Sequence, residues 1–465
     1  MKIYTLLLVF SLGFSQINWS YETIDSIEGL EAGIGFASLK LDSLIVPHVV
    51  YYKLVWDTTY HDTGWAKLIY AYKTDNQWIE ETVDSSLGSG FTNYYLSPCL
   101  CLDKYDNPHI VYIHHTEDNI HYLHYAQKFH GQWLDTILLI GVSRASLSLD
   151  TNDYPCIAVT HRSDIDTVQR IKYLSWSGIL WDSCTVDYNQ LPDNSPSLGI
   201  NSNNNPHIAY LQDNPDSLKY VFWNGVNWIF SWGESVGSGC SQSLSLDIND
   251  YPHIAYSRFG YLYYTFWDGN VWNTEGPIEP ATKVLLDLDS LYLPHIIAIA
   301  EGLFRPRYYY RDSLTWHLCG WIEPDPYSVT FHTVSFCLDN NDQPHVVYFS
   351  DNGYAGKLKY AKGTFVGIEE NDAGFRIHDA GWRINIHPNI SYGYLTIEYS
   401  LRNTGDVEIE IYDVIGAKRK SIKFKNCQSG NYTKILNLSD LASGVYFVVL
   451  KQNNEQVSKK FLLVK

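Results

Sequence analysis

Aromatic, cationic and imidazole side chains collect in loops of variable length between residues 56 and 307. Tryptophan and tyrosine rings can stack on a sugar ring, and arginine and histidine can donate hydrogen bonds to a polar ligand. The candidate ligand-binding residues are Trp56, Tyr60, His61, Trp65, Tyr94, Tyr95, His114, His115, Arg162, Arg258, Arg305 and Arg307. The chemistry that these residue types support is non-covalent recognition of a glycan or of a protein surface. We assign no catalytic residue among them.

The loop between residues 56 and 65 is the longest of these loops and carries a tryptophan at each end. We expect Trp56, Tyr60 and Trp65, with Tyr94 and Tyr95 from the loop that follows, to form the principal contact surface. An aromatic ring stacked on a ligand ring contributes roughly 0.5–1.5 kcal/mol beyond its buried area. The alternative is that these aromatic side chains only pack the long loop onto its own sheet.

A second cluster, His114, His115 and His121, contains imidazoles that could bind a metal ion. The alternative is a solvated loop in which the three histidines have no common ligand. The sequence contains no D-x-D-x-D-G calcium loop and no C-x-x-C pair of the kind that binds zinc. We therefore predict neither a metal site nor a cofactor.

A repeated motif surrounds these loops. An Asp or Asn stands five residues before a Pro in seven places, and His follows the Pro in six of them, with Cys156 in the third. The repeat residues are Asp42, His48, Asp103, His109, Asp150, Asn201, His207, Asp247, His253, Asp289, His295, Asp339 and His345. Because they recur in almost every copy, we interpret them as structural, with the His facing the Asp across a turn and satisfied there.

The interval from one repeat Pro to the next is 42 to 61 residues, and each copy holds four short apolar runs. Such a period is typical of a β-propeller, so the sequence predicts an all-β chain with seven four-stranded blades, a to d. Antiparallel alternation places the variable b–c and d–a loops on one face and the repeated turns on the other. Residues around Trp19 are similar to those around Trp78, which predicts that the N-terminus supplies strand d of the last blade and removes an open edge.

The formal charge is −18, which excludes nucleic acid as a natural partner. From Arg376 onward 13 Lys and Arg stand against 8 Asp and Glu, so the tail carries +5 and the rest of the chain −23. The acidic part favours neutral or cationic ligands. Residues 1–15 are expected to be a signal peptide, since Lys2 precedes an apolar run too short to span a bilayer. We expect no transmembrane segment, a secreted or cell-surface location, a monomer, and buried thiols for the eight Cys.

Past residue 366 the repeat ends. Residues 367–375 are expected to be a linker, and residues 376–465 an Ig-like β-sandwich. The tail resembles the C-terminal sorting domain of type IX secretion substrates in Bacteroidetes and related bacteria. The matching segments are Pro388-Asn389, 395–401, 411–416, 441–447 and 460–465, with Ile390 where that family usually has a second Pro. The resemblance implies export across the outer membrane by the type IX machinery, followed by release or attachment to the surface.

Residues 16–366 resemble exported bacterial propellers whose repeat reads D-x-x-G-x-P-H-I-A-Y, similar in plan to fucose-binding lectins and sialidases. The resemblance implies a fold more than a function. A binding module for glycan or protein on the b–c/d–a loop face is the favoured hypothesis. A glycoside hydrolase is the second: a sialidase-like site needs three convergent Arg, and only Arg162, Arg258, Arg305 and Arg307 lie in b–c loops. A structural surface protein without a ligand is the third.

Overall fold

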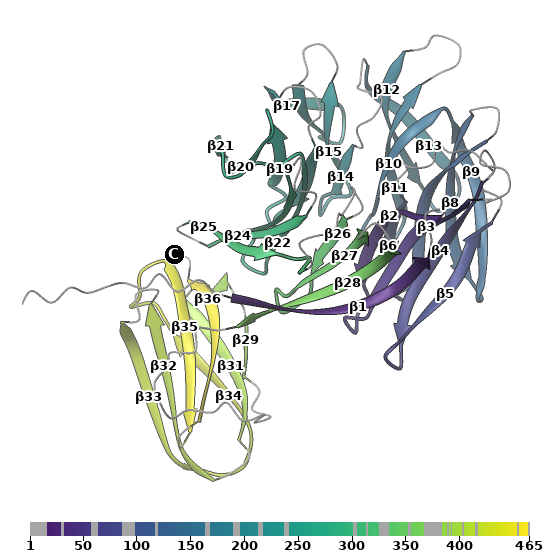
Figure 1. Ribbon diagram of the computed structural model, residues 1–465. Coiled ribbons are helices and arrows are strands. Elements are labelled where there is room, and N and C mark those ends of the chain that lie inside the picture. Colours follow the sequence, from purple (N-terminus) through teal and green to yellow (C-terminus); the bar gives the residue numbers. More distant parts are fainter. Residues whose placement is uncertain are drawn as a thin grey trace, which may run out of the picture. The chain divides into compact units, whose positions relative to one another are not determined.

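The computed structural model describes residues 16–28, 32–56, 64–85, 98–116, 120–162, 168–188, 196–212, 217–236, 241–300, 305–312, 315–324, 334–351, 355–366, 384–387, 390–391, 393–401, 404–413, 417–452 and 455–463. All regular structure in these ranges is β-strand (Figure 1). No helix within them is long and apolar enough to cross a membrane. Contacts separate the strands into two compact units, β1 to β28 and β29 to β36. The expected signal peptide and linker lie outside the described residues.

The first unit consists of seven four-stranded antiparallel sheets, which are the seven blades. The first blade contains β2 (Ala32–Leu41), β3 (Pro47–Trp56), β4 (Gly64–Thr74) and β5 (Gln77–Asp84). The second contains β6 (Cys99–Leu102), β7 (Pro108–His115), β8 (His121–Phe129) and β9 (Gln132–Ile140). The third contains β10 (Val142–Leu149), β11 (Pro155–Arg162), β12 (Gln169–Trp176) and β13 (Trp181–Tyr188). The fourth contains β14 (Ser197–Ile200), β15 (Pro206–Gln212), β16 (Ser217–Trp223) and β17 (Trp228–Ser235).

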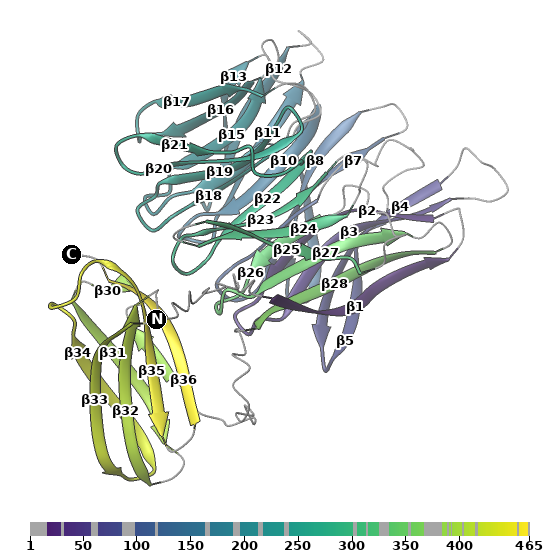
Figure 2. The same ribbon diagram turned by 60° about the vertical axis from the view of Figure 1, so that its left-hand side comes forward.

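The remaining three blades keep the same strand order. The fifth contains β18 (Gln242–Leu246), β19 (Pro252–Arg258), β20 (Tyr261–Trp267) and β21 (Trp272–Glu275). The sixth contains β22 (Lys283–Leu288), β23 (Pro294–Ile299), β24 (Pro306–Arg311) and β25 (Trp316–Trp321). The seventh contains β26 (Val334–Leu338), β27 (Pro344–Asp351), β28 (Ala355–Val366) and, as its outer strand, β1 (Gln16–Glu28). Strand β1 runs along β28 in both views, so the N-terminal strand completes the last blade (Figures 1 and 2).

The turn between strands a and b is set by the repeat Asp or Asn. In the second blade Oδ1 of Asp103 accepts hydrogen bonds from the backbone N–H groups of Tyr105 (2.9 Å) and Asn107 (2.7 Å). The residue three positions after the repeat Asp has a positive φ in every blade, for example 64° at Asp106 and 61° at Asn204. Asp and Asn tolerate this left-handed conformation better than most residues, which explains their density in these turns.

The repeat His bridges that turn and strand c. In the seventh blade Nδ1 of His345 is hydrogen-bonded to the Tyr360 hydroxyl (2.6 Å), and its Nε2 lies 3.3 Å from Oδ2 of Asp339. Both nitrogens are satisfied by the neutral imidazole that carries its proton on Nε2. Burial lowers the pKa of His345 to about 4. The repeat Tyr on strand c is therefore the second partner of the His, alongside the carboxylate.

Two rings of contacts hold neighbouring blades together. The first is aromatic: the repeat Tyr of each blade meets the strand-d Trp of the next edge to face, with ring centroids 5.3–5.8 Å apart. The pairs are Tyr70–Trp133, Tyr125–Trp181, Tyr173–Trp228, Tyr220–Trp272, Tyr264–Trp316, Tyr308–Trp19 and Tyr360–Trp78. Trp19 thus has the same role as the other six tryptophans, although its strand comes from the N-terminus.

The second ring is polar and joins the innermost strands, which contact one another in a closed circle. A side chain on each innermost strand is hydrogen-bonded to the backbone of the next. The links are Ser38 to Leu100, Cys99 and Cys101 to Ala145 and Leu147, Ser146 to Leu198, Ser197 to Leu244, Ser243 to Leu286, Asp287 to Leu338, and Ser335 to Leu39. In the second blade the thiols donate to carbonyl oxygens, so Cys99 and Cys101 replace the serine hydroxyl in this ring.

The second unit is a two-sheet sandwich. One sheet contains β29 (Ile384–His387), β31 (Tyr394–Leu401) and β34 (Gly430–Asn437). The other contains β30 (Ile390–Ser391), β36 (Glu455–Leu463), β35 (Gly444–Gln452), β32 (Gly405–Asp413) and β33 (Lys418–Cys427). Apolar side chains from both sheets, among them Leu395, Val407 and Phe461, share one buried core. This unit therefore has its own hydrophobic core.

Candidate functional site

The first-loop residues fall mostly outside the described part of the chain. Tyr60, His61, Tyr94 and Tyr95 lie outside it. For Trp56 and Trp65 only the backbone is described. Trp56 ends β3 opposite Gly64, and Trp65 lies on β4 opposite Val55. The expected contact surface on these aromatics stays a prediction.

The described arginines of the loop face contact partners within or between neighbouring blades. Arg258 forms an ion pair with Glu234, whose other oxygen accepts from the Tyr256 hydroxyl. The same trio of tyrosine, carboxylate and base recurs elsewhere between blades, with Lys as the base. These trios are Tyr51–Asp25–Lys53 and Tyr210–Asp187–Lys219. Arg258 is therefore part of a repeated inter-blade contact.

Arg305 and Arg307 meet on one indole ring in the sixth blade. Their guanidinium carbons lie 4.6 Å and 4.0 Å from the ring centroid of Trp321, within the range of cation–π contact. Arg307 also lies 3.6 Å from a carboxylate oxygen of Glu279. Arg162 ends β11, exposed, and its N–H donates to the Gly141 carbonyl. The described contacts thus bring two arginines together, and Arg162 and Arg258 have partners elsewhere.

The histidines of the second blade point to two different sides of its sheet. His115 lies opposite His121 with ring centroids 4.6 Å apart, whereas the His114 ring lies 5.6 Å from that of His124. Burial lowers the pKa of both His114 and His121. Within the described ranges no group of three or more His, Cys, Asp or Glu side chains is arranged to hold a metal ion.

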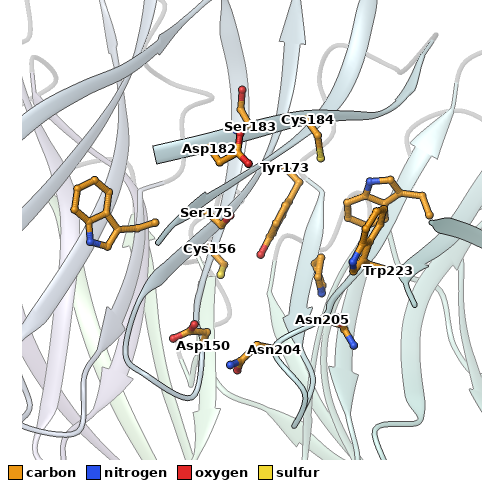
Figure 3. A pocket seen from close by; sticks show the side chains of 13 residues that line it. Asp150, Cys156, Tyr173, Ser175, Asp182, Ser183, Cys184, Asn204, Asn205 and Trp223 are labelled. Atoms are coloured by element: carbon orange, nitrogen blue, oxygen red, sulfur yellow. The ribbon is translucent and has the colours of Figure 1, made fainter. Parts of the chain in front are cut away.

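A cavity of about 440 Å³ opens between the third and fourth blades, at the end that carries the repeated turns (Figure 3). Tyr173 lies near its centre, with Cys156 and Ser175 on one side and Trp223 on the other. Asp182 lies at one end of the cavity and Asp150 at the opposite end. None of the predicted ligand-binding residues lines it.

The cavity results from two departures from the repeat at positions that face each other. Cys156 on β11 is paired in register with Ser175 on β12. In four other blades the corresponding positions hold two stacked rings, with centroids 5.5–5.9 Å apart. These pairs are His48–Tyr72, His207–Phe222, His253–Phe266 and His295–Tyr310. The third blade therefore has two small side chains where most blades have two aromatic rings.

The missing imidazole also changes the surroundings of the repeat carboxylate. In five blades Nε2 of the His lies 3.3–3.9 Å from Oδ2 of the Asp. In the third blade Oδ1 of Asp150 accepts from the N–H groups of Asn152 and Tyr154, both at 2.8 Å, as the repeat turn requires. Its Oδ2 is left with one long contact among the described residues, 3.4 Å from Nδ2 of Asn152. The carboxylate thus has an acceptor oxygen without its usual partner.

The aromatic side chains of the cavity hold one another in place. The Tyr173 and Trp228 rings meet edge to face at 5.8 Å, and Trp228 packs against Trp223 in the same way at 5.5 Å. Trp176 lines the cavity from the third blade. Burial raises the pKa of the Cys156 thiol to about 11, so it is not a nucleophile at neutral pH. The arrangement suits reversible binding of a ring with polar substituents.

The sequence pattern alone does not predict this cavity. Cys156 was visible as a departure from the repeat, and Asp150 as a repeat residue. Ser175, two residues after the repeat Tyr173, is the corresponding signal on strand c. Only the strand register shows that Cys156 and Ser175 lie opposite each other.

Comparison with known proteins identifies the tail. Residues 385–465 match the family described as the secretion system C-terminal sorting domain. The tail is a type IX sorting domain. It marks the protein for secretion or for attachment to the cell surface. No curated protein sequence matches the chain.

Three solved structures are similar to the chain at low identity. PorZ, a surface component of the type IX secretion system of Porphyromonas gingivalis, is 12% identical with a TM-score of 0.40, over 90% of this chain and 58% of PorZ. The SapL1 lectin in complex with α-methyl fucoside is 12% identical with a TM-score of 0.44, over 64% of this chain and 98% of the lectin. A family PL25 ulvan lyase is 10% identical with a TM-score of 0.49, over 72% and 95%. The chain thus spans little more than half the length of PorZ.

Proposed function

We propose that this protein is a saccharide-binding module that acts outside the cell, and that the cavity between the third and fourth blades holds the sugar. The observation that carries the proposal is that Cys156 and Ser175 stand where four other blades hold two stacked rings, which opens a lined cavity. The sorting domain sends the protein to the compartment where polysaccharides and surface glycans are found.

The size and lining of the cavity support a sugar ligand. Its volume of about 440 Å³ falls in the range of roughly 300–1,000 Å³ that is usual for small-molecule sites. Trp176, Trp223 and Trp228 offer apolar faces for the C–H groups of a sugar ring. Asn205 and Ser175 have no hydrogen-bond partner for their side chains among the described residues, and they can pair with ring hydroxyls.

The carboxylates of the cavity support binding over hydrolysis. A glycoside hydrolase needs one carboxyl group to protonate the leaving oxygen and another to act as base or nucleophile. Asp150 is fixed by the two turn N–H groups that it accepts, and Asp182 accepts from the N–H of Ser183 at 2.8 Å. Both carboxylates thus already serve the local backbone, and the binding module is the better supported of the two hypotheses.

The test is a glycan array followed by calorimetry with the full mature protein. The variant Cys156→His/Ser175→Phe restores the ring pair of the fourth blade and fills the cavity. We expect it to lose saccharide binding while its melting temperature stays equal or rises. The matched control, Gln127→Phe, places an aromatic opposite His109 in the second blade and should leave binding unchanged. Unchanged binding by the filled variant would show that the sugar binds elsewhere, for example on the loop face.

A further inference from the structure

We infer that the cavity between the third and fourth blades selects an amino sugar, whose ammonium group takes the place that the repeat imidazole occupies in the other blades. This inference rests on the proposed function and adds the chemical class of the ligand. Its basis is the comparison of one vacated position with six filled ones.

The filled blades show what the vacated position binds. An imidazole there has a nitrogen within 3.9 Å of the carboxylate of the turn and another nitrogen bonded to the repeat tyrosine hydroxyl, at 2.6 Å for His109 and Tyr125. In the third blade the carboxylate is Asp150 and the tyrosine is Tyr173. The Tyr173 hydroxyl is already hydrogen-bonded to the Cys156 thiol, so what the third blade lacks is the N–H that the neutral imidazole directs at the carboxylate. A protonated amine has three N–H donors and can supply one to Asp150.

The charge of the residues that line the cavity also favours a cationic ligand. The described lining residues include Asp150 and Asp182 and no Lys, Arg or His. They belong to a part of the chain with a net charge of −23, which raises the local concentration of cations and repels acidic sugars. A neutral sugar could fill the volume and donate a hydroxyl to Asp150, but the lining would then hold two carboxylates, Asp150 and Asp182, with no positive charge near them.

The remaining lining favours a sugar over a basic peptide side chain. Tryptophans stand on both sides of the cavity, Trp176 from the third blade and Trp223 and Trp228 from the fourth. Ser183 and Asn204 lie near opposite ends, beside Asp182 and Asp150 (Figure 3). Polar groups spread around aromatic faces match a ring with several hydroxyl groups, whereas a lysine chain would use only the carboxylate end.

The experiment compares two probes on the full mature protein near neutral pH: the glucosamine trimer and the N-acetylglucosamine trimer, which differ in the charge of the amine. Calorimetry should give an affinity at least about tenfold higher for glucosamine, a ratio that corresponds to about 1.4 kcal/mol. This preference should fall with added salt and as the amine of the ligand loses its proton at higher pH.

The variant Asp150→Asn tests the position of the ammonium. The fourth blade already uses Asn201 at this place in its turn, where its Oδ1 accepts from the N–H groups of Asn203 (3.0 Å) and Asn205 (2.8 Å), so the variant keeps the turn. It should reduce the glucosamine affinity to that of the N-acetylated trimer and leave the latter unchanged. The control Asp247→Asn, in the fifth blade, should change neither affinity.

The outcomes separate this inference from the proposed function. Equal affinities for the two trimers, or a preference that survives in Asp150→Asn, would overturn the amino-sugar inference and leave saccharide binding intact. Competition by a lysine-rich peptide at equal affinity would also overturn it. Failure to bind any glycan on the array would overturn both.

Discussion

The third and fourth blades are built on the same repeat and differ at a facing pair of residues on strands b and c. His207 and Phe222 fill the fourth blade with stacked rings, whereas Cys156 and Ser175 leave the third with a cavity. Both blades keep the turn, the repeat tyrosine and the edge-to-face contact with the next tryptophan. A propeller can thus gain a cavity between two blades by omitting structural side chains, without a new loop.

The features found on the loop face and on the turn face of the propeller differ from what residue types alone indicate. The loop face carries the arginines, and Arg258 forms an inter-blade ion pair there. The turn face consists of repeated elements, and the blade without the repeat His forms one side of the cavity. A departure within the repeat itself can thus open a cavity on the face where the turns are alike.

The largest expected effect comes from copying the third-blade pair into the fourth. The variant His207→Cys/Phe222→Ser should lower the free energy of unfolding by about 3–5 kcal/mol, because a buried imidazole and a partly buried phenyl ring are removed from a filled interface. Denaturant unfolding measures the change. A loss below about 1 kcal/mol would contradict the view that the rings fill this interface.

Acid should destabilise the propeller through its neutral buried histidines. Burial lowers the pKa of His207 and of His345 to about 4, below the ordinary value near 6.5. The contribution of these two histidines to the free energy of unfolding is complete above about pH 6.5. It is lost as the pH falls toward 4, because the unfolded chain binds the protons first. Each histidine should lower the free energy of unfolding by about 3 kcal/mol at the acid end. Melting temperatures of the full chain between these pH values measure the loss, and His345→Gln should reduce its slope.

The sorting domain should respond in a lower pH window. Hydrogen bonds from Lys418 and Lys451 lower the pKa of Glu410 to about 2, although burial opposes them. The contribution of Glu410 to the free energy of unfolding is present above about pH 4.5 and is lost as the pH falls toward 2. Calorimetric scans should thus show the propeller transition shifting between pH 6.5 and 4 while the sorting-domain transition holds. A shift of both transitions over the same pH range would contradict this prediction.

A smaller effect is expected from the aromatic wall of the cavity. Trp223→Ala should weaken saccharide binding by up to about tenfold, since one stacking contact contributes roughly 0.5–1.5 kcal/mol. Trp267 occupies the corresponding position in the fifth blade, opposite Trp272 as Trp223 is opposite Trp228. Trp267→Ala is therefore the matched control and should leave binding unchanged in calorimetry. Equal losses in both variants would indicate a general effect on the fold.

The smallest expected effect concerns the polar ring of innermost strands. Ser243→Ala removes one link, the 3.0 Å hydrogen bond from the N–H of Leu286. The free energy of unfolding should fall by about 1 kcal/mol, the usual net contribution of such a bond. The change should be the same with and without saccharide, because Ser243 lies outside the third and fourth blades.

The sequence by itself determined the all-β fold, the seven blades and the sorting domain. Turn chemistry and strand alternation act over a few residues, so Asp, Pro and His at fixed spacing specify each blade locally. It also pointed to the outer strand of the last blade, because Trp19 stands in the same local pattern as the other repeat tryptophans. The sorting motifs are likewise local to the tail.

Only the tertiary structure decided which residues meet. The number of residues between facing positions on strands b and c differs from blade to blade: it is larger for His48 and Tyr72 than for His253 and Phe266. Spacing alone therefore does not pair Cys156 with Ser175. Contacts between blades join residues about fifty positions apart, as Thr151 and Asn204 do across the third and fourth turns. A cavity is the space that two such sets of side chains leave unfilled, and it is determined by packing in three dimensions, which no local pattern records.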